Sequence, residues 1–375
     1  MLSWIEIDTA SARHNIDAFR SLLATGTSLM VVVKANAYGH GLSVFAPLAA
    51  ERADWLGVNA LDEALEIRTL GIRTPIVILG YTEKDQLAAV VSNQFRQVVY
   101  REDIALGLSE AAVQQNTTAH IHLKLETGTN RQGIPLGDLP QLVRRIRAMP
   151  GLNIEGAYTH FANIEDTLDP SFALRQLERF REATGVLEAE GVRPSLVHAS
   201  ATAGALLYPE TGFTMVRLGI GAYGIWPSRE TQLAARERGR RIVLKPAMTW
   251  KTRVAQIKTV EAGEHVSYGL TYQASHRMKV AVLPIGYYDG YDRKLSNCGR
   301  VLIHGQAVPV IGRVAMNMTM LDVTDVPCQP DDEVVLLGRQ GAAEIRAEDL
   351  AEKIGTIAYE VVSRINPRIP RIASG

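Results

Sequence analysis

The feature that most constrains the fold is an eightfold alternation of strand-like and helix-like segments over residues 29–220. The strand-like segments are short and apolar, as in buried parallel strands; they are 29–33, 55–59, 75–80, 97–100, 119–125, 153–160, 195–199 and 214–220. Helical patterns lie between them, at 41–52, 61–70, 83–92, 102–114, 137–149, 170–190 and, more briefly, 202–208. Such alternation is typical of a parallel sheet. Eight units predict an α/β fold of the TIM (β/α)8 barrel type, with a doubly wound open sheet as the alternative.

The pattern changes near residue 228. Residues 229–241 read as a charged connector, and the segments beyond it alternate apolar and polar residues between Gly, Pro and Asp turns; they are 248–257, 278–285, 300–304, 307–311, 318–323 and 333–337. One helix is predicted near 346–354. This pattern indicates a smaller, mainly β domain. We therefore predict a barrel over 9–240 and a β domain over 241–375, which the strand-like residues 1–8 join.

Charge and cysteine content exclude several classes of protein. Lys plus Arg and Asp plus Glu each total 40, so the formal net charge is zero and no basic excess favours nucleic acid or an anionic membrane. The two cysteines, Cys298 and Cys328, are too few for a disulfide framework. The N-terminal segment lacks the basic and apolar regions of a signal peptide, and no apolar run reaches transmembrane length. A cytoplasmic protein is expected.

Polar residues gather where the predicted strands end, which is the catalytic rim of a TIM barrel. They are Lys34 and Tyr38 after the first strand, Lys124 and Arg131 with the fifth, His160 with the sixth, His198 and Thr202 with the seventh, and Arg217, Gly219 and Ile220 with the eighth. No Cys/His cluster has metal-ligand spacing, so no metal is predicted.

The apolar run at 30–33 ends on Lys34. A lysine that is partly removed from water can lose its proton and condense with an aldehyde; alternatively, Lys34 simply points to solvent at a strand end. Barrels often bind phosphate after strands seven and eight, where Thr202 offers a hydroxyl and Gly219 and Ile220 offer backbone N–H groups. A reactive lysine opposite a phosphate site indicates pyridoxal 5'-phosphate.

The stretch Val-Lys-Ala-Asn-Ala-Tyr-Gly-His-Gly at 33–41 resembles the cofactor-lysine motif of the alanine racemases. Further motifs of that family occur in order at 4–8, 158–162, 216–220, 267–269 with 271–272, 286–290, 312–316, 358–361 and 368–371. The resemblance covers almost the whole chain. It implies a pyridoxal-phosphate barrel followed by a β domain, acting as a head-to-tail homodimer with shared active sites.

The resemblance implies two bases, because racemisation needs a group on each face of the substrate Cα. Lys34 resembles the lysine that binds the cofactor and serves one face of the external aldimine. Tyr268 resembles the base on the other face, contributed to the Lys34 of the partner subunit. A phenol with a pKa of about 10 needs cationic or hydrogen-bonding neighbours to act near neutral pH, and His160 and Arg217 resemble those neighbours. The alternative for Tyr268 is a packed tyrosine of the β domain.

Arg217 resembles the arginine that faces the cofactor's pyridine nitrogen. An arginine only donates hydrogen bonds, so it leaves that nitrogen unprotonated and limits side reactions. The alternative is a structural arginine in an ion pair. A decarboxylase of the same barrel type would be expected to have a carboxylate at this place.

The remaining site residues are also implied by the resemblance. Arg131 would contact the cofactor's phenolic oxygen and the substrate carboxylate, and Lys124 is a possible carbamylated lysine that steadies it. Met316 would offer its backbone N–H to the substrate carboxylate from the partner subunit. The phosphate site would comprise Tyr38, Thr202, Gly219, Ile220 and Tyr359; the entry channel would be lined by Tyr287, Arg293 and Arg313; and His40 and His198 would support the site.

The function implied is that of an alanine racemase, an isomerase that makes D-alanine for peptidoglycan precursors. Four residues depart from the commonest family pattern: Glu126, Thr129, Gln132 and Asn317. They leave open a serine or broad-spectrum racemase of the same family. A third alternative is a non-catalytic pyridoxal-phosphate-binding protein, against which the whole β domain and Tyr268 argue.

Overall fold

The computed structural model describes residues 1–375, and the chain divides into two compact units. The barrel unit comprises Arg13–Ala35 and Ala46–Leu244. The β unit comprises Met1–Ala12, Asn36–Phe45 and Lys245–Gly375. Not one helix combines the length and the apolar character needed to cross a bilayer.

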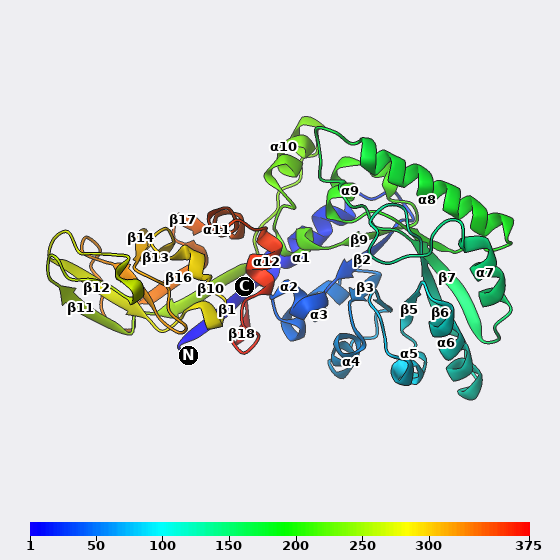
Figure 1. Ribbon diagram of the computed structural model, residues 1–375, viewed down its shortest axis with the longest axis horizontal. Coiled ribbons are helices and arrows are strands. Elements are labelled where there is room, and N and C mark those ends of the chain that lie inside the picture. The colour runs from blue at the N-terminus through cyan, green and yellow to red at the C-terminus, as the bar shows by residue number, and fades with distance from the viewer. The chain divides into compact units, whose positions relative to one another are not determined.

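The barrel unit is built on eight parallel strands (Figure 1). They are β2 (Ser28–Val32), β3 (Trp55–Val58), β4 (Ile76–Ile78), β5 (Arg96–Val99), β6 (Ala119–Lys124), β7 (Leu152–Tyr158), β8 (Leu196–His198) and β9 (Met215–Leu218). The order β8-β7-β6-β5-β4-β3-β2-β9 places the last strand beside the first. Only isolated hydrogen bonds join β8 to the β9 segment, such as the one from Thr214 N, just before β9, to Val197 O at 3.1 Å. The predicted barrel is therefore confirmed, and the open sheet is excluded.

Helices follow the strands as the sequence predicted. They are α1 (Thr9–Arg20), α3 (Leu42–Ala50), α4 (Leu61–Thr69), η1 (Lys84–Gln86) with α5 (Leu87–Ser92), α6 (Glu102–Gln114), α7 (Leu139–Arg147), α8 (Ser171–Ala189) and α9 (Thr202–Leu207), with the short η2 (Pro209–Thr211) and η3 (Ile220–Tyr223). Residues 229–241 were described as a charged connector, but most of this segment forms a helix, α10 (Arg229–Glu237). Ser228 caps this helix by accepting a hydrogen bond from Thr231 N at 3.0 Å, as serine commonly does at a helix N-terminus.

The β unit contains one sheet with the strand order β11-β12-β15-β14-β13-β16-β10-β1-β18, and β17 pairs with β16. The strands are β1 (Ser3–Asp8), β10 (Met248–Arg253), β11 (Gln256–Val260), β12 (Met278–Leu283), β13 (Arg300–Ile303), β14 (Gln306–Ile311), β15 (Thr319–Asp322), β16 (Glu333–Gln340), β17 (Ala343–Ile345) and β18 (Arg371–Ser374). Short helices complete it: η4 (Tyr268–Leu270), η5 (Tyr287–Asp289), η6 (Arg293–Leu295), α11 (Ala347–Ile354) and α12 (Ala358–Ser363).

The expectation of one strand over 248–257 was wrong. The chain changes partner at Val254 and Ala255, whose N–H groups bond Asp332 O at 3.0 Å and Val282 O at 2.8 Å. As a result β10 and β11 lie far apart in the sheet order although only two residues separate them. The first strand, β1, pairs antiparallel with β10 and parallel with β18.

Candidate functional site

Lys34 follows β2 and begins a short turn, α2 (Lys34–Tyr38), whose backbone is left-handed. The four residues after the lysine, Ala35 to Tyr38, have φ between 52° and 55°, and Gly39 follows at φ 80°. For residues other than glycine this conformation costs roughly 1–2 kcal/mol each. Strained backbone of this kind concentrates at functional sites. The sequence predicted that the strand would break here, but not a left-handed turn.

Contacts within the β unit hold the second half of this turn. The Asn36 side chain accepts a hydrogen bond from Leu42 N at 2.7 Å, and Asn36 O accepts one from Gly41 N at 2.9 Å. A Cβ atom at Gly39 would lie 1.9 Å from the carbonyl oxygen of Val362. Only glycine therefore fits at position 39 without moving α12.

Lys34 belongs to a cluster of four cations in the barrel unit. Burial lowers the pKa of Lys34, and Arg131 and Arg217 lower it further, whereas Glu63 opposes them. Burial and the same two arginines lower the pKa of Lys124 to about 8. Cations that destabilise one another in this way make the site strongly attractive to an anion.

Arg217 is buried and held from several sides. Its Nη2 donates to Thr159 O at 2.8 Å and Ala199 O at 2.9 Å, and its Nη1 donates to His198 O at 3.0 Å. Nη1 also lies 2.8 Å from His198 Nδ1. The guanidinium is 5.1 Å from the centre of the Tyr158 ring. These contacts fix the plane of the guanidinium.

His160 lies beside this arginine, with Nδ1 3.2 Å from Arg217 Nη2. Burial, with Arg217 and Arg131, lowers the pKa of His160 to about 3. The imidazole is therefore neutral near pH 7, and because arginine can only donate, Nδ1 accepts and Nε2 carries the proton.

Thr202 joins the loops that follow β8 and β9. Its Oγ1 accepts hydrogen bonds from Gly219 N at 3.2 Å and Gly221 N at 3.3 Å. A Cβ atom at Gly221 would lie 2.6 Å from Phe19 and 2.8 Å from Thr202, so this glycine is needed for the close approach. In the β unit, the rings of Tyr38 and Tyr359 lie 6.2 Å apart.

The unusual residues of the loop after β6 each have a partner inside the barrel unit. Glu126 accepts from Gly128 N at 2.6 Å, and Thr129 donates to His160 O. Gln132 accepts from Lys124 Nζ at 3.3 Å and donates to Tyr100 Oη at 3.2 Å.

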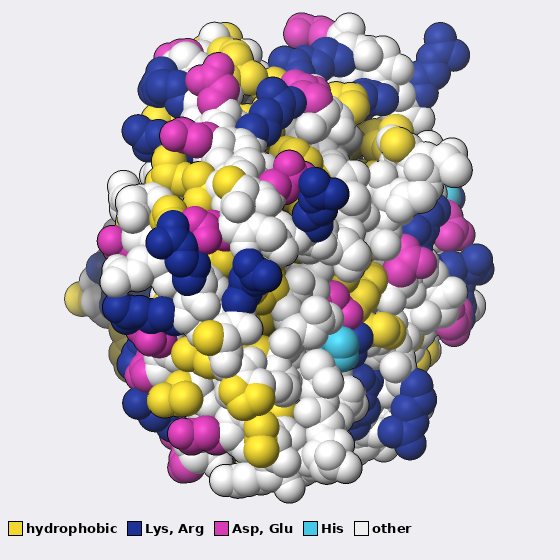
Figure 2. Space-filling model, turned by 90° about the vertical axis from the view of Figure 1, so that its right-hand side faces the viewer, with side chains coloured by type: hydrophobic (Ala, Val, Ile, Leu, Met, Phe, Trp, Pro, Cys, Tyr) yellow, Lys and Arg dark blue, Asp and Glu magenta, His cyan; other side chains and the backbone are white.

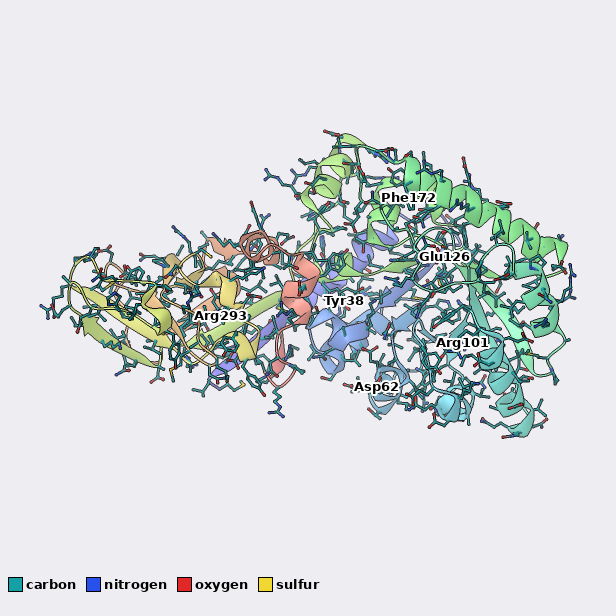
Figure 3. The ribbon with its side chains drawn as sticks, in the orientation of Figure 1. Tyr38, Asp62, Arg101, Glu126, Phe172 and Arg293 are labelled. Atoms are coloured by element: carbon teal, nitrogen blue, oxygen red, sulfur yellow. The ribbon has the colours of Figure 1, made fainter.

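The same loop packs on the start of α8. A Cβ atom at Gly128 would lie 3.2 Å from the ring of Phe172, and both Glu126 and Phe172 are labelled in Figure 3. Three of the departures from the family pattern, Glu126, Thr129 and Gln132, are therefore held by hydrogen bonds within the barrel unit.

Tyr268 lies on the surface of the β unit, with 73% of the residue exposed. Its neighbours Ser267 and Leu270 have φ of 68° and 51°, and Ser267 Oγ donates to Arg313 O at 2.6 Å. Met316 is also exposed, at 55%. Leu270, Tyr287, Tyr288 and Met318 of the β unit are exposed as well.

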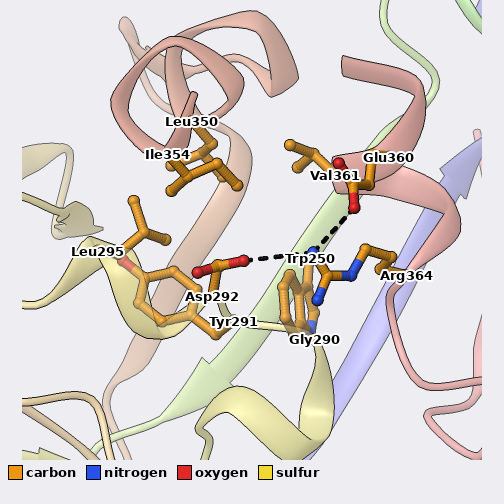
Figure 4. Close-up of a pocket in the computed structure, with 10 residues that line it drawn as sticks. All are labelled: Trp250, Gly290, Tyr291, Asp292, Leu295, Leu350, Ile354, Glu360, Val361 and Arg364. Atoms are coloured by element: carbon orange, nitrogen blue, oxygen red, sulfur yellow. Dashed lines mark hydrogen bonds and ion pairs between the residues drawn. The ribbon is translucent and has the colours of Figure 1, made fainter. Parts of the chain in front are cut away.

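A pocket in the β unit does not contain the predicted site (Figure 4). It has a volume of about 340 Å³ including the space open to solvent, and it is lined by Trp250, Gly290, Tyr291, Asp292, Leu295, Leu350, Ile354, Glu360, Val361 and Arg364. Arg364 pairs with Glu360 at 3.0 Å and with Asp292 at 3.4 Å. None of the residues predicted to bind cofactor or substrate lines it.

Charged side chains of both signs are interspersed on the face drawn in Figure 2. That face shows no extended basic area of the kind that binds nucleic acid.

Comparison with known proteins identifies both parts of the chain. Residues 7–227 match the family model "Alanine racemase, N-terminal domain", and residues 247–373 match "Alanine racemase, C-terminal domain". An alanine racemase of Syntrophobacter fumaroxidans is 42% identical over 365 residues, covering 97% of this chain and 95% of that protein.

Solved structures of racemases resemble this chain over its full length. The alanine racemase of a D-cycloserine-producing Streptomyces lavendulae has a TM-score of 0.93 at 36% identity, over 100% of this chain and 97% of that one. A histidine racemase of Leuconostoc mesenteroides has a TM-score of 0.89 at 29% identity, over 100% and 98%. The same fold therefore occurs in racemases of different amino acids.

Proposed function

This chain belongs to the alanine racemase family, and we propose that it interconverts L-alanine and D-alanine with pyridoxal 5'-phosphate as its cofactor. The observation that carries the proposal is the partly buried Lys34, which stands among Arg131, Arg217 and Lys124 with a lowered pKa. These surroundings disfavour the charged form of the amine.

The residues present fit the cofactor. The cation cluster favours an anionic group, and Thr202 with the backbone of Gly219 and Ile220 would hold its phosphate, together with Tyr38 and Tyr359. We propose that Lys34 anchors it, that Arg217 and His160 face its ring, and that Arg131 contacts its phenolic oxygen. When bound, the cofactor supplies an electron sink for the negative charge that develops at the substrate Cα.

We propose that Lys34 and Tyr268 are the two bases. Lys34 Nζ removes the Cα proton from the D-isomer, and Tyr268 Oη returns a proton to the opposite face; for the L-isomer the roles are exchanged. One base alone would tend to return the proton to the side from which it came. The two groups must therefore lie on opposite faces of Cα.

The exposure of Tyr268 supports a homodimer. Its phenol is 73% exposed on the β unit, whereas a phenol needs nearby cations to ionise near neutral pH. We propose that it enters the barrel of a second copy, where Arg217 and His160 would supply those neighbours, and that Met316 accompanies it to meet the substrate carboxylate.

Arg217 has a second proposed role, in reaction specificity. It can only donate a hydrogen bond, and the His160 and His198 imidazoles beside it are kept neutral by burial. Neither the arginine nor these imidazoles therefore gives a proton to a ring nitrogen at neutral pH. This arrangement favours racemisation over reactions that require a protonated ring to withdraw more electron density from the substrate Cα.

Lys124 is a candidate for carbamylation. Its pKa of about 8 leaves part of the amine uncharged at neutral pH, which is the form that reacts with carbon dioxide. The carbamate would turn a cation beside Arg131 into an anion. A single enriched carbamate carbonyl resonance after incubation with 13C-bicarbonate would support this, and its loss in Lys124→Gln would assign it.

Serine or a broad range of amino acids is the alternative substrate. Cα proton exchange in deuterated water, measured with purified protein and single amino acids, decides between them. We expect exchange with both enantiomers of alanine and much slower exchange with serine and histidine. Exchange with serine and none with alanine would refute the alanine assignment, and exchange with no amino acid would favour a non-catalytic binding protein. We further predict a cytoplasmic location and a role in supplying D-alanine for peptidoglycan precursors.

A further inference from the structure

The interior of the barrel is polar below the proposed cofactor site, where most TIM barrels pack branched apolar side chains. Alternate residues of β6, His120, His122 and Lys124, share one face of the strand. The His122 ring lies 5.1 Å from that of His198 on β8 and 6.2 Å from that of Trp55 on β3. This face is therefore the inside of the barrel.

Four side chains follow one another there, and hydrogen-bond distances join the first three. Arg217 Nη1 lies 2.8 Å from His198 Nδ1, and His198 Nε2 lies 2.9 Å from His122 Nδ1. His122 Nε2 faces Glu155 Oε2 at 3.5 Å; this contact is longer than a hydrogen bond, and the buried nitrogen has no hydrogen-bond partner. Glu155 ends the line in a two-pronged pair with Arg96, at 2.8 Å and 3.1 Å.

The backbone is shaped to make this line. The pairing of β6 with β7 shifts register between Ile121 and His122, so that Ile121 faces Ile154 and His122 faces Gly156. Glu155 is the extra residue of that bulge, which turns its side chain toward the histidines. A Cβ atom at Gly156 would lie 2.5 Å from the His122 ring, so only glycine leaves room for it.

The chemistry of the two ends fixes every proton in the line. Arginine can only donate, so His198 Nδ1 must accept and His198 Nε2 must carry the proton. That proton is donated to His122 Nδ1, so His122 carries its own proton on Nε2. The carboxylate of Glu155 is an acceptor only, so its charge at 3.5 Å favours a proton on that nitrogen. Each ring is then neutral and has one defined tautomer.

We propose that Glu155 and His122 are positioning residues for Arg217: they hold the lone pair of His198 Nδ1 toward the guanidinium and so keep Arg217 aimed into the cofactor site. The inference rests on the proposed role of Arg217 and adds residues far from the reacting atoms. The line is not a proton wire, because Arg217 does not release its proton. It transmits orientation only.

Neighbouring groups support this reading. The Tyr158 ring is stacked on His198 at 4.8 Å with planes 4° apart, which prevents the imidazole from turning. Burial lowers the pKa of both His122 and His198, so neither gains a second proton at neutral pH. His120 Nδ1 lies 3.6 Å from Glu155 Oε1 and completes the surroundings of the carboxylate.

Glu155→Gln tests the proposal, because an amide can donate where the carboxylate could not. The amide N–H can reverse the line, placing the proton of His198 on Nδ1, where it would oppose an N–H of Arg217. Neutron diffraction of the deuterated holoenzyme should show Nε2–H on both rings of the wild type and a reversed or disordered pattern in the variant. We expect kcat to fall about 10-fold with KM little changed, by analogy with groups that orient a metal ligand.

Two further variants separate positioning from folding. Glu190→Gln removes a comparable two-pronged pair with Arg144 at the surface and should leave kcat and the proton positions unchanged. Arg96→Gln weakens the end of the line but keeps the accepting carboxylate, so the tautomers and kcat should stay near the wild type.

The proton positions in the wild type decide the matter even if Glu155→Gln does not fold. A proton on His198 Nδ1, or a doubly protonated ring, would overturn the proposal. So would a Glu155→Gln enzyme with unchanged kcat. Because neutron diffraction requires no turnover, a protein that failed to racemise alanine would refute the proposed function and still allow this test.

Discussion

The two proposed bases stand in opposite surroundings but share one backbone feature. Lys34 is partly buried in a cluster of cations, and this environment lowers its pKa. Tyr268 is 73% exposed. Yet both adjoin left-handed residues: Ala35 to Tyr38 follow the lysine, and Ser267, Gly269 and Leu270 flank the tyrosine. The chain thus sets the surroundings of the lysine by itself, whereas in the proposed shared site the groups around the tyrosine would come from a second copy.

Removing the buried base should have the largest effect. We expect Lys34→Ala to abolish visible absorption by bound cofactor and to lower kcat/KM by at least about 10⁴-fold, since both the anchor and one base are lost. Absorption spectra and racemisation assays measure the two effects. Lys84→Ala is a matched control, because Lys84 only pairs with Asp103 at the surface. Normal cofactor absorption in Lys34→Ala would show that another residue is the anchor.

Removing the exposed base should cost less and leave the cofactor in place. We expect Tyr268→Phe to keep the absorption band and to lower kcat by about 10²- to 10⁴-fold, the range for loss of a general acid or base. Tyr288→Phe, another exposed tyrosine of the β unit, is the control and should behave like the wild type. Loss of the cofactor from Tyr268→Phe would mean that the tyrosine binds it instead of acting as a base.

Mixing the two inactive variants tests whether the exposed base serves another chain. If the sites are shared, a dimer of one Lys34→Ala chain and one Tyr268→Phe chain has one site with both defects and one site intact. Random reassociation should then restore about one quarter of wild-type activity, since half of the dimers are mixed. If each chain supplies both of its own bases, every site carries a defect and no activity returns.

Burial should also decide how pH affects stability. Burial alone would raise the pKa of Glu155, but the nearby His122 and the hydrogen-bonded Arg96 outweigh it and lower that pKa to about 2. A carboxylate with a depressed pKa stabilises the fold above its ordinary pKa of about 4.3, and the contribution is lost as the pH falls toward 2.

We therefore expect Glu155→Gln to lower the free energy of unfolding by about 3 kcal/mol at pH 7, as when one partner of a buried pair is removed. The difference from the wild type should shrink between about pH 5 and pH 2, measured by urea unfolding. Asp103 has a similarly low pKa, set by its bonds to Lys84 and Arg101 at the surface, so Asp103→Asn should change stability much less. If Glu155→Gln and Asp103→Asn lowered the free energy of unfolding equally, burial would not decide how much a carboxylate of low pKa contributes to stability.

Sequence reasoning could find what depends on local periodicity. The eight barrel strands were predictable because each is an apolar run between helical patterns, and Lys34 was recognisable because it ends one of them. The split at Val254 and Ala255 was hidden, since alternation continues while the chain changes partners. The left-handed turn at Ala35 to Tyr38 was hidden as well, because alanine ordinarily favours the right-handed helix.

The line from Arg217 to Glu155 shows a second kind of limit. The spacing of His120, His122 and Lys124 was visible and could have indicated a polar barrel interior. The role of Glu155 could not be read in the same way, because alternation along β7 gives it the opposite face from Tyr158. Only the bulge at that residue turns the carboxylate inward.

The smallest predicted effect concerns the shared backbone feature. Ala35 is exposed and has φ 55°, so Ala35→Gly should relieve steric strain and change stability by about +1 kcal/mol or less, after the larger entropy loss of glycine is subtracted. Ala148→Gly is the matched control: this exposed alanine has φ −78°, and the substitution should destabilise by roughly 0.5–1 kcal/mol. Chemical denaturation measures both. If Ala35→Gly destabilises as much as Ala148→Gly, the turn after Lys34 stores no strain. The left-handed residues beside Lys34 and Tyr268 would then be a similarity of backbone geometry without an energetic cost.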